Sequence, residues 1–113
     1  MSNKILLVCV LGVFAGQTSA MGVSGNAAAG KQKAVTVCAA CHGADGNKTL
    51  DDSYPKLAGQ YPDYMLKALK EYKSGKRSNA IMAGQVQALS EADMANRALY
   101  YASLKSQIGT LPQ

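Results

Sequence analysis

The stretch Cys38-Ala39-Ala40-Cys41-His42 places two thiols three residues apart and an imidazole directly after the second thiol. This C-x-x-C-H spacing is the attachment sequence of a c-type haem. Each thiol can add to one of the two vinyl groups of a porphyrin, and the histidine then lies where it can ligate the iron. The motif therefore predicts one covalent haem c on Cys38 and Cys41, with His42 as an axial ligand of the iron.

Other proteins also use a bare C-x-x-C, in thioredoxin-like redox pairs and in halves of zinc sites. The chain has three cysteines and one histidine in total, and it has no second C-x-x-C, so a four-ligand zinc site lacks ligands. No βαβ pattern surrounds the motif, as a thioredoxin-like fold would require. A structural disulfide or a redox dithiol between Cys38 and Cys41 is the remaining alternative.

Residues 1–20 have the features of a secretory signal peptide. Lys4 supplies a positive charge, residues 5–15 are mostly apolar, and small residues end the segment at Ala20. A membrane anchor is the alternative, but the apolar run is shorter than the roughly 20 residues needed to span a bilayer. We therefore expect cleavage after Ala20, which leaves residues 21–113 as one periplasmic domain without a membrane span.

The predicted mature chain is small, and its six large aromatic residues are all tyrosines. Removing 20 of the 113 residues leaves 93, and the loss of Cys9 and Phe14 leaves neither Phe nor Trp. Because small chains bury a modest fraction of their surface, an apolar macrocycle would supply the missing core. We expect the chain without haem to fold poorly. Loss of Lys4 changes the formal charge from +5 to +4, which favours acidic partner proteins. Nucleic acid is disfavoured because the lysines are scattered and the chain is exported.

The pattern of caps and apolar residues predicts an all-α fold with three main helices. Asn26 and Ser90 are the expected N-caps of the first and last helix, with Asp93 completing a shortened capping box. Gly30 costs the first helix about 1 kcal/mol relative to alanine. A close helix crossing would explain its presence, and simple tolerance of a glycine is the alternative. The expected helices are Ala27 to about Val37, Pro62 to about Ser74, and Glu91 to about Ser103 or Leu104.

The second axial ligand cannot be a histidine, because His42 is the only one in the chain. Methionine, lysine, tyrosine, water or no ligand remain. Of the four mature methionines, Met21 is terminal, and Met65 and Met94 have the helical spacing of core residues. Met82 lies in a stretch that we expect to be irregular, where the backbone can bring a thioether to the iron. We predict Met82 as the ligand, with core packing as the alternative.

The loop after the motif contains a candidate partner for the histidine. Residues 43–54 are rich in turn formers, and Pro55 follows them. The carbonyl of Pro55 can accept the second ring N–H of His42, which would orient the imidazole and raise its basicity. A simple turn proline is the alternative.

These motifs together resemble those of a small class I cytochrome c, of the c553/c5-like kind or a single half of the c4 group. The matching blocks are Cys38 to Asn47, Pro55 to Gln60, Tyr72 to Arg77, Met82 ahead of Leu89-Ser90, and Ala98 to Ser103. The resemblance implies three main helices wrapped on one haem, with the first and last crossing at Gly30 and at Tyr100 or Tyr101. It implies thioether links at Cys38 and Cys41 and axial ligation by His42 and Met82.

The resemblance also offers weaker candidates. Lys76, Arg77 and Asn79 could contact a haem propionate, with a solvated link between two helices as the alternative. Many relatives carry a second methionine before the ligand, where this chain has Ile81. The absence of that competitor favours Met82.

Three functions follow from these expectations. The first is a soluble, monomeric one-electron carrier, not an enzyme, which shuttles between periplasmic redox enzymes or membrane complexes. The second is the cytochrome subunit of a dehydrogenase that oxidises, for example, a sulfur compound or an alcohol, where the haem would be a fixed relay. The third is a peroxidase-like enzyme or gas sensor with an open iron. A filled coordination sphere favours the first over the third.

Overall fold

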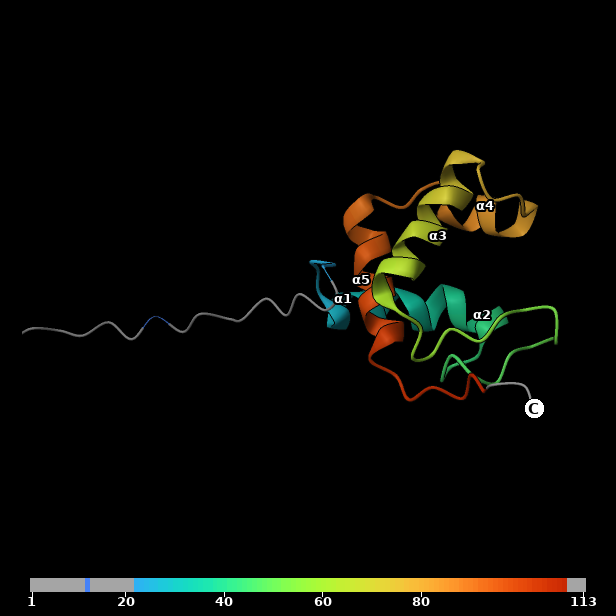
Figure 1. Ribbon diagram of the computed structural model, residues 1–113, viewed down its shortest axis with the longest axis horizontal. Coiled ribbons are helices and arrows are strands. Elements are labelled where there is room, and N and C mark those ends of the chain that lie inside the picture. Colours follow the sequence, from blue (N-terminus) through green and yellow to red (C-terminus); the bar gives the residue numbers. More distant parts are fainter. Residues whose placement is uncertain (1–11, 13–21, 110–113) are drawn as a thin grey trace, which may run out of the picture.

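The computed structural model describes residue 12 and residues 22–109, and this part of the chain is helical (Figure 1). Its elements are α1 (Ala27–Lys33), the π-helix η1 (Ala34–Cys38), α2 (Ala39–His42), α3 (Pro62–Ser74), α4 (Ala80–Val86) and α5 (Glu91–Ala102). The described residues contain no strand, which confirms the predicted all-α class. The predicted signal peptide lies outside the described residues, apart from Gly12.

The first helical run extends further than predicted. Asn26 caps it as expected, with its side chain accepting a hydrogen bond from the backbone N–H of Ala29 at 3.0 Å. The run then passes without a break through α1, η1 and α2 and ends at His42. Gly43 stops it with φ = 85°, where a Cβ atom would lie 2.2 Å from the carbonyl oxygen of Lys48. The whole C-x-x-C-H motif is therefore helical.

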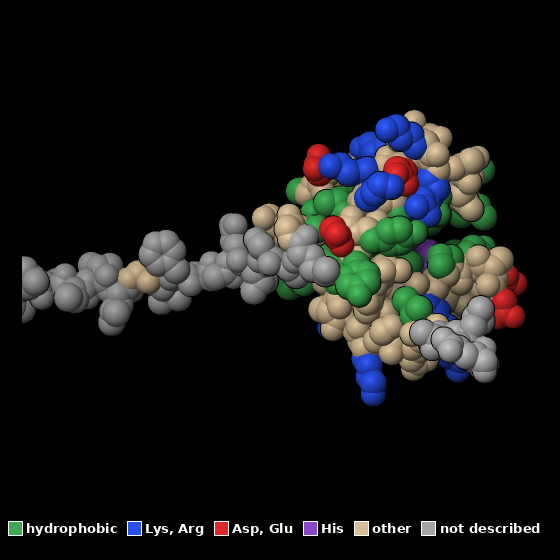
Figure 2. All heavy atoms as spheres, viewed as in Figure 1, with side chains coloured by type: hydrophobic (Ala, Val, Ile, Leu, Met, Phe, Trp, Pro, Cys, Tyr) green, Lys and Arg blue, Asp and Glu red, His purple; other side chains and the backbone are tan. Residues whose placement is uncertain are grey.

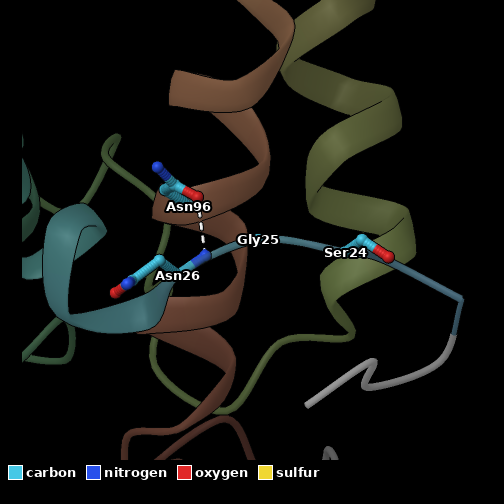
Figure 3. Close-up of a pocket in the computed structure, with 4 residues that line it drawn as sticks. All are labelled: Ser24, Gly25, Asn26 and Asn96. Carbon is cyan, nitrogen blue, oxygen red and sulfur yellow. Dashed lines mark hydrogen bonds between the residues drawn. The ribbon is translucent and has the colours of Figure 1, made fainter. Parts of the chain in front are cut away.

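Gly30 is the point at which α1 crosses α5. A Cβ atom on Gly30 would lie 2.0 Å from the carbonyl oxygen of Asn96 and 2.9 Å from the backbone nitrogen of Arg97. The Asn96 side chain also accepts a hydrogen bond from the backbone N–H of Asn26 at 2.7 Å (Figure 3). The expected close crossing is present, but its partners on α5 are Asn96 and Arg97. The α5 atoms nearest to Gly30 therefore belong to the backbone of Asn96 and Arg97, and not to Tyr100 or Tyr101 as predicted.

The two tyrosines fill the core instead. Their rings lie against each other with centroids 5.1 Å apart, and both side chains are buried. The main cluster of buried side chains brings α3, α5 and η1 together, and Cys38 packs against it. Its members are Ala34, Met65, Ala98, Tyr100 and Tyr101.

The second and last helices have local sequence signals that the structure confirms. Pro62 occupies the first turn of α3, and Gly75 ends that helix in the left-handed conformation with φ = 84°. Ser90 and Asp93 form both hydrogen bonds of the capping box at the start of α5. Both signals depend on residues only a few positions apart in the chain, so they could be recognised without knowledge of the tertiary structure.

The stretch from Ala80 to Leu89 differs from the prediction. It was expected to be irregular, but Ala80–Val86 forms the short helix α4, which packs on α3. Asn79 caps this helix. Figure 1 shows α4 near the upper end of α3, with α2 toward the bottom of the view. The cap signal at Asn79 was available in the sequence, but the short helix has no long apolar period to accompany it.

Candidate functional site

The two thiols of the motif lie on adjacent turns of one helical run. Both Cys38 and Cys41 are free and half-buried. Positions three residues apart share one face of a helix, so the two sulfur atoms can reach the same ligand. Cys38 packs against the core cluster that contains Tyr101. Burial in that cluster, and secondarily the neighbouring thiol of Cys38, raises the pKa of the Tyr101 phenol above its ordinary value.

His42 is buried, with 6% of its surface exposed, and one ring nitrogen has a partner. Its Nδ1 lies 2.8 Å from the carbonyl oxygen of Pro55. A carbonyl oxygen can only accept, so Nδ1 is the donor in this bond. The neutral ring therefore keeps the lone pair on Nε2 free for a metal. The ring of Tyr54 meets the imidazole edge to face, with centroids 6.2 Å apart.

The loop between α2 and α3 holds Pro55 in place by backbone hydrogen bonds. The carbonyl oxygen of Gly46 accepts from Leu57 at 2.8 Å and from Ala58 at 3.0 Å. Gly59 donates to the carbonyl oxygen of Tyr101 at 2.8 Å, and so attaches the loop to the end of α5. The position of the His42 imidazole is thus determined by contacts that reach the core helices.

Asn47 is a structural residue of the site that the sequence did not reveal. Its side chain is buried and donates to the carbonyl oxygen of Lys105 at 3.0 Å, while accepting from the backbone N–H of Gln107 at 3.0 Å. These bonds join the loop after the motif to the chain beyond α5. Asn47 ends the matching block that begins at Cys38, but an asparagine among turn formers is common, so the sequence assigned it no role.

The carboxylate of Asp45 tightens the same loop. It accepts from the backbone N–H groups of Asn47 at 2.8 Å and of Lys48 at 2.9 Å. The bond from Lys48, followed by that from Asn47, lowers the pKa of the Asp45 carboxyl below its ordinary value.

Met82 lies on α4 and is half-buried, whereas two other methionines are core residues. Met65 belongs to the main core cluster at 6% exposure, and Met94 on α5 is 3% exposed. Met21 lies outside the described residues. Among the described methionines, Met82 is thus the one whose sulfur is not committed to the core. Figure 2 shows the histidine, in purple, in a recess between hydrophobic side chains of the upper and lower parts of the molecule.

Two of the residues suggested as contacts of a haem propionate, which lie between α3 and α4, have partners within the chain. The guanidinium of Arg77 lies 5.7 Å from the ring centroid of Tyr64 and 5.5 Å from that of Tyr72, and its Nε is 3.3 Å from Glu71 Oε2. Asn79 caps α4. These contacts give Arg77 and Asn79 structural roles, whatever else they bind.

Taken together, the donors suit a covalent haem. They are two free thiols on one helix face, an imidazole with its Nε2 available, and a thioether on a second helix. Among the described residues, no group of three or more His, Cys, Asp or Glu side chains could hold a metal ion by itself. A porphyrin meets this difficulty because it supplies four of the iron ligands itself.

Comparison with known proteins points to one family. The profile of the family described as cytochrome c matches residues 27–106. The chain is 45% identical over 107 residues to cytochrome c4 of Pseudomonas aeruginosa, covering 95% of this chain and 51% of that protein. It is 41% identical over 68 residues to the thiosulfate dehydrogenase electron acceptor of Thiomonas intermedia, covering 60% of this chain and 31% of that protein.

A solved structure agrees with these matches. Reduced recombinant cytochrome c4 from Pseudomonas stutzeri superposes with a TM-score of 0.68 at 40% identity, covering 75% of this chain and 48% of that one. The chain therefore spans about half the length of the cytochromes c4 that it matches.

Proposed function

The chain belongs to the cytochrome c family, and from this premise we propose that it is a periplasmic one-electron carrier with a haem c ligated by His42 and Met82. The observation that carries the proposal is the hydrogen bond of His42 Nδ1 to Pro55, which leaves Nε2 available beside two free thiols. The iron supplies the electron chemistry by alternating between its ferric and ferrous states.

The residues of this chain would each have a defined task. Cys38 and Cys41 would hold the haem covalently, each through a thioether link that its S–H group would form by addition to a vinyl group. His42, through its ring nitrogen Nε2, and Met82, through its thioether sulfur, would hold the iron, and a thioether ligand favours the ferrous state. With both axial positions filled, no site is open for a substrate, and we assign the protein no catalytic step. Pro55 orients the imidazole.

The cellular location of the protein and its binding partners are part of the same proposal. Residues 1–20 would be removed as a signal peptide, and residues 21–113 would act in the periplasm. Among the described residues, no helix is both long and apolar enough to cross a membrane. Cytochromes c work with redox partner proteins, and the basic balance of the chain suits partners with an acidic docking surface. We propose that the mature protein acts as a monomer.

Optical spectra of the protein, exported together with a haem-maturation system, test the proposal. We expect a c-type spectrum and, in the oxidised form, the weak far-red band of a sulfur-to-iron bond. Met82→Ala should abolish that band and lower the reduction potential, because the thioether stabilises ferrous iron. Met65→Leu is the control, since Met65 is a core residue, and it should retain the band. A high-spin oxidised spectrum of the unsubstituted protein would contradict His/Met ligation and favour the open-iron function.

One observation favours a second candidate function. The similarity to a protein named as the electron acceptor of thiosulfate dehydrogenase is consistent with a haem that relays electrons within an enzyme complex. Size exclusion of native periplasm separates the two candidates. A free small species supports the shuttle, whereas co-elution with a large dehydrogenase supports the fixed relay.

A further inference from the structure

The helix that bears Met82 has little tertiary packing of its own. α4 contains seven residues, and Val86 is its one buried side chain. Ile81, next to Met82, is 54% exposed. Isolated helices of fewer than about 12 residues are marginal in water, so a helix this short depends on whatever fixes its ends. The position of the Met82 sulfur therefore depends on the first turn of α4.

Asn79 fixes that turn by accepting two hydrogen bonds, one from Met82 and one from the residue after it. Its side-chain Oδ1 accepts from the backbone N–H of Met82 at 3.0 Å, and its carbonyl oxygen accepts from the backbone N–H of Ala83 at 2.9 Å. The backbone of Asn79 is extended, with φ = −161° and ψ = 114°, as an N-cap requires. Asparagine is among the strongest N-cap residues.

We propose that Asn79 is a positioning residue for the Met82 thioether. By binding the backbone N–H of Met82, it holds the first turn of α4 and keeps the sulfur at the iron. When that turn frays, the sulfur can leave, and a small ligand from solution can take its place. Asn79 thus sets the fraction of molecules in which the iron is open. This inference rests on the proposed ligation by Met82.

The chain contains a matched control for this role. Asn26 caps α1 in the same way, with its side chain accepting from the backbone N–H of Ala29, three residues on, at 3.0 Å. α1 packs chiefly on α5, whereas α4 packs on α3. Loss of the Asn26 side chain should therefore weaken the fold by a similar amount without acting on the segment that carries Met82.

The experiment is a titration of the oxidised haem protein with imidazole, which binds the iron only when the sulfur has left. The apparent affinity is proportional to the open fraction. We expect Asn79→Ala to raise the apparent imidazole affinity about fivefold, the change that corresponds to loss of a typical cap. Asn79→Ser should restore the original affinity, because serine also caps. Asn26→Ala should leave it unchanged while lowering the thermal midpoint followed by circular dichroism.

Two results would overturn the inference without touching the proposed ligand. One is an unchanged imidazole affinity in Asn79→Ala. The other is an equal rise in Asn26→Ala, which would show that the effect follows overall stability. Failure of the proposed function has a different signature, since the unsubstituted protein would then lack the far-red band. That result would remove the Met82 ligand and this inference with it.

Discussion

The two sides of the haem site are built in different ways. His42 is 6% exposed, its ring is bonded to Pro55, and the loop that carries Pro55 is bonded to the end of α5. Met82 lies on a seven-residue helix that packs on α3. The proposed ligand His42 is thus held by the core of the protein, and the proposed ligand Met82 by a local cap.

This difference predicts which side of the haem site should open first when the protein is destabilised. The His42 side is hydrogen-bonded to the end of α5 and packs through Cys38 on the main core cluster, so it should open only when the whole fold opens. The Met82 side can loosen by fraying one short helix. A protein built in this way would keep its covalent haem in place even if the proposed Met82 ligand left the iron.

The largest difference in stability between the two sides should appear when a glycine on each side is replaced, in separate variants, by alanine. Gly30→Ala places a Cβ atom 2.0 Å from the Asn96 carbonyl oxygen, so α1 and α5 must separate. We expect a loss of about 3 kcal/mol or more in the free energy of unfolding, measured by urea denaturation. Gly84→Ala on α4 is the matched substitution, because nothing beyond the adjacent residues and the backbone of its own helix lies within 4 Å of the new Cβ. It should stabilise α4 by up to about 1 kcal/mol. Equal effects at both glycines would contradict the comparison.

A smaller effect is expected from removing one side-chain amide on each side. Asn47→Ala leaves the carbonyl of Lys105 and the N–H of Gln107 without their partner in a part-buried site, which should cost about 1–3 kcal/mol. Gln87→Ala on the Met82 side removes an exposed bond to the Lys73 carbonyl at 3.4 Å, and should cost less than about 0.5 kcal/mol. Urea denaturation of both variants gives the comparison. A larger loss of stability in Gln87→Ala than in Asn47→Ala would contradict the comparison between the two sides.

Removing the cap of α5 should lower the free energy of unfolding by an amount between those expected for Asn47→Ala and Gln87→Ala. Ser90→Ala removes the hydroxyl that accepts from the backbone N–H of Asp93, whereas the backbone N–H at position 90 can still donate to the Asp93 carboxylate. We expect a loss of about 1 kcal/mol in the free energy of unfolding. Thermal unfolding followed by circular dichroism measures it. Because α5 belongs to the core, the far-red band should disappear together with the helical signal. Separate transitions in this variant would show that α5 does not anchor the His42 side.

The smallest effect concerns pH. The hydrogen bond from Lys67, and then the neighbouring Arg77, lower the pKa of Glu71. Because the folded value is below the unfolded one of about 4.3, the stabilisation is present above that pH. It is lost as the pH falls through the folded value. Glu71→Gln should therefore flatten the acid limb of stability measured by urea denaturation between about pH 5 and 3. An unchanged limb would show that Glu71 does not support the α3–α4 link.

Prediction from the sequence succeeded where the signal is local. The bounds of α3 followed from Pro62 and Gly75, and the capping box of α5 followed from Ser90 and Asp93. Prediction failed at α4, whose helix is too short to show an apolar period. It also failed for the partner of Gly30, because a glycine indicates a close approach without indicating which backbone approaches it.

The sequence by itself determined the cofactor chemistry of this protein and the class of its fold. Two thiols and an imidazole at C-x-x-C-H spacing need no distant residue to define their ligand, and caps and turn residues define helix ends within a few positions. Only the tertiary structure decided which backbone meets Gly30, which segments Asn47 joins, and how the two sides of the site are held. These features depend on which distant segments of the chain come together, and that follows from packing of the whole molecule.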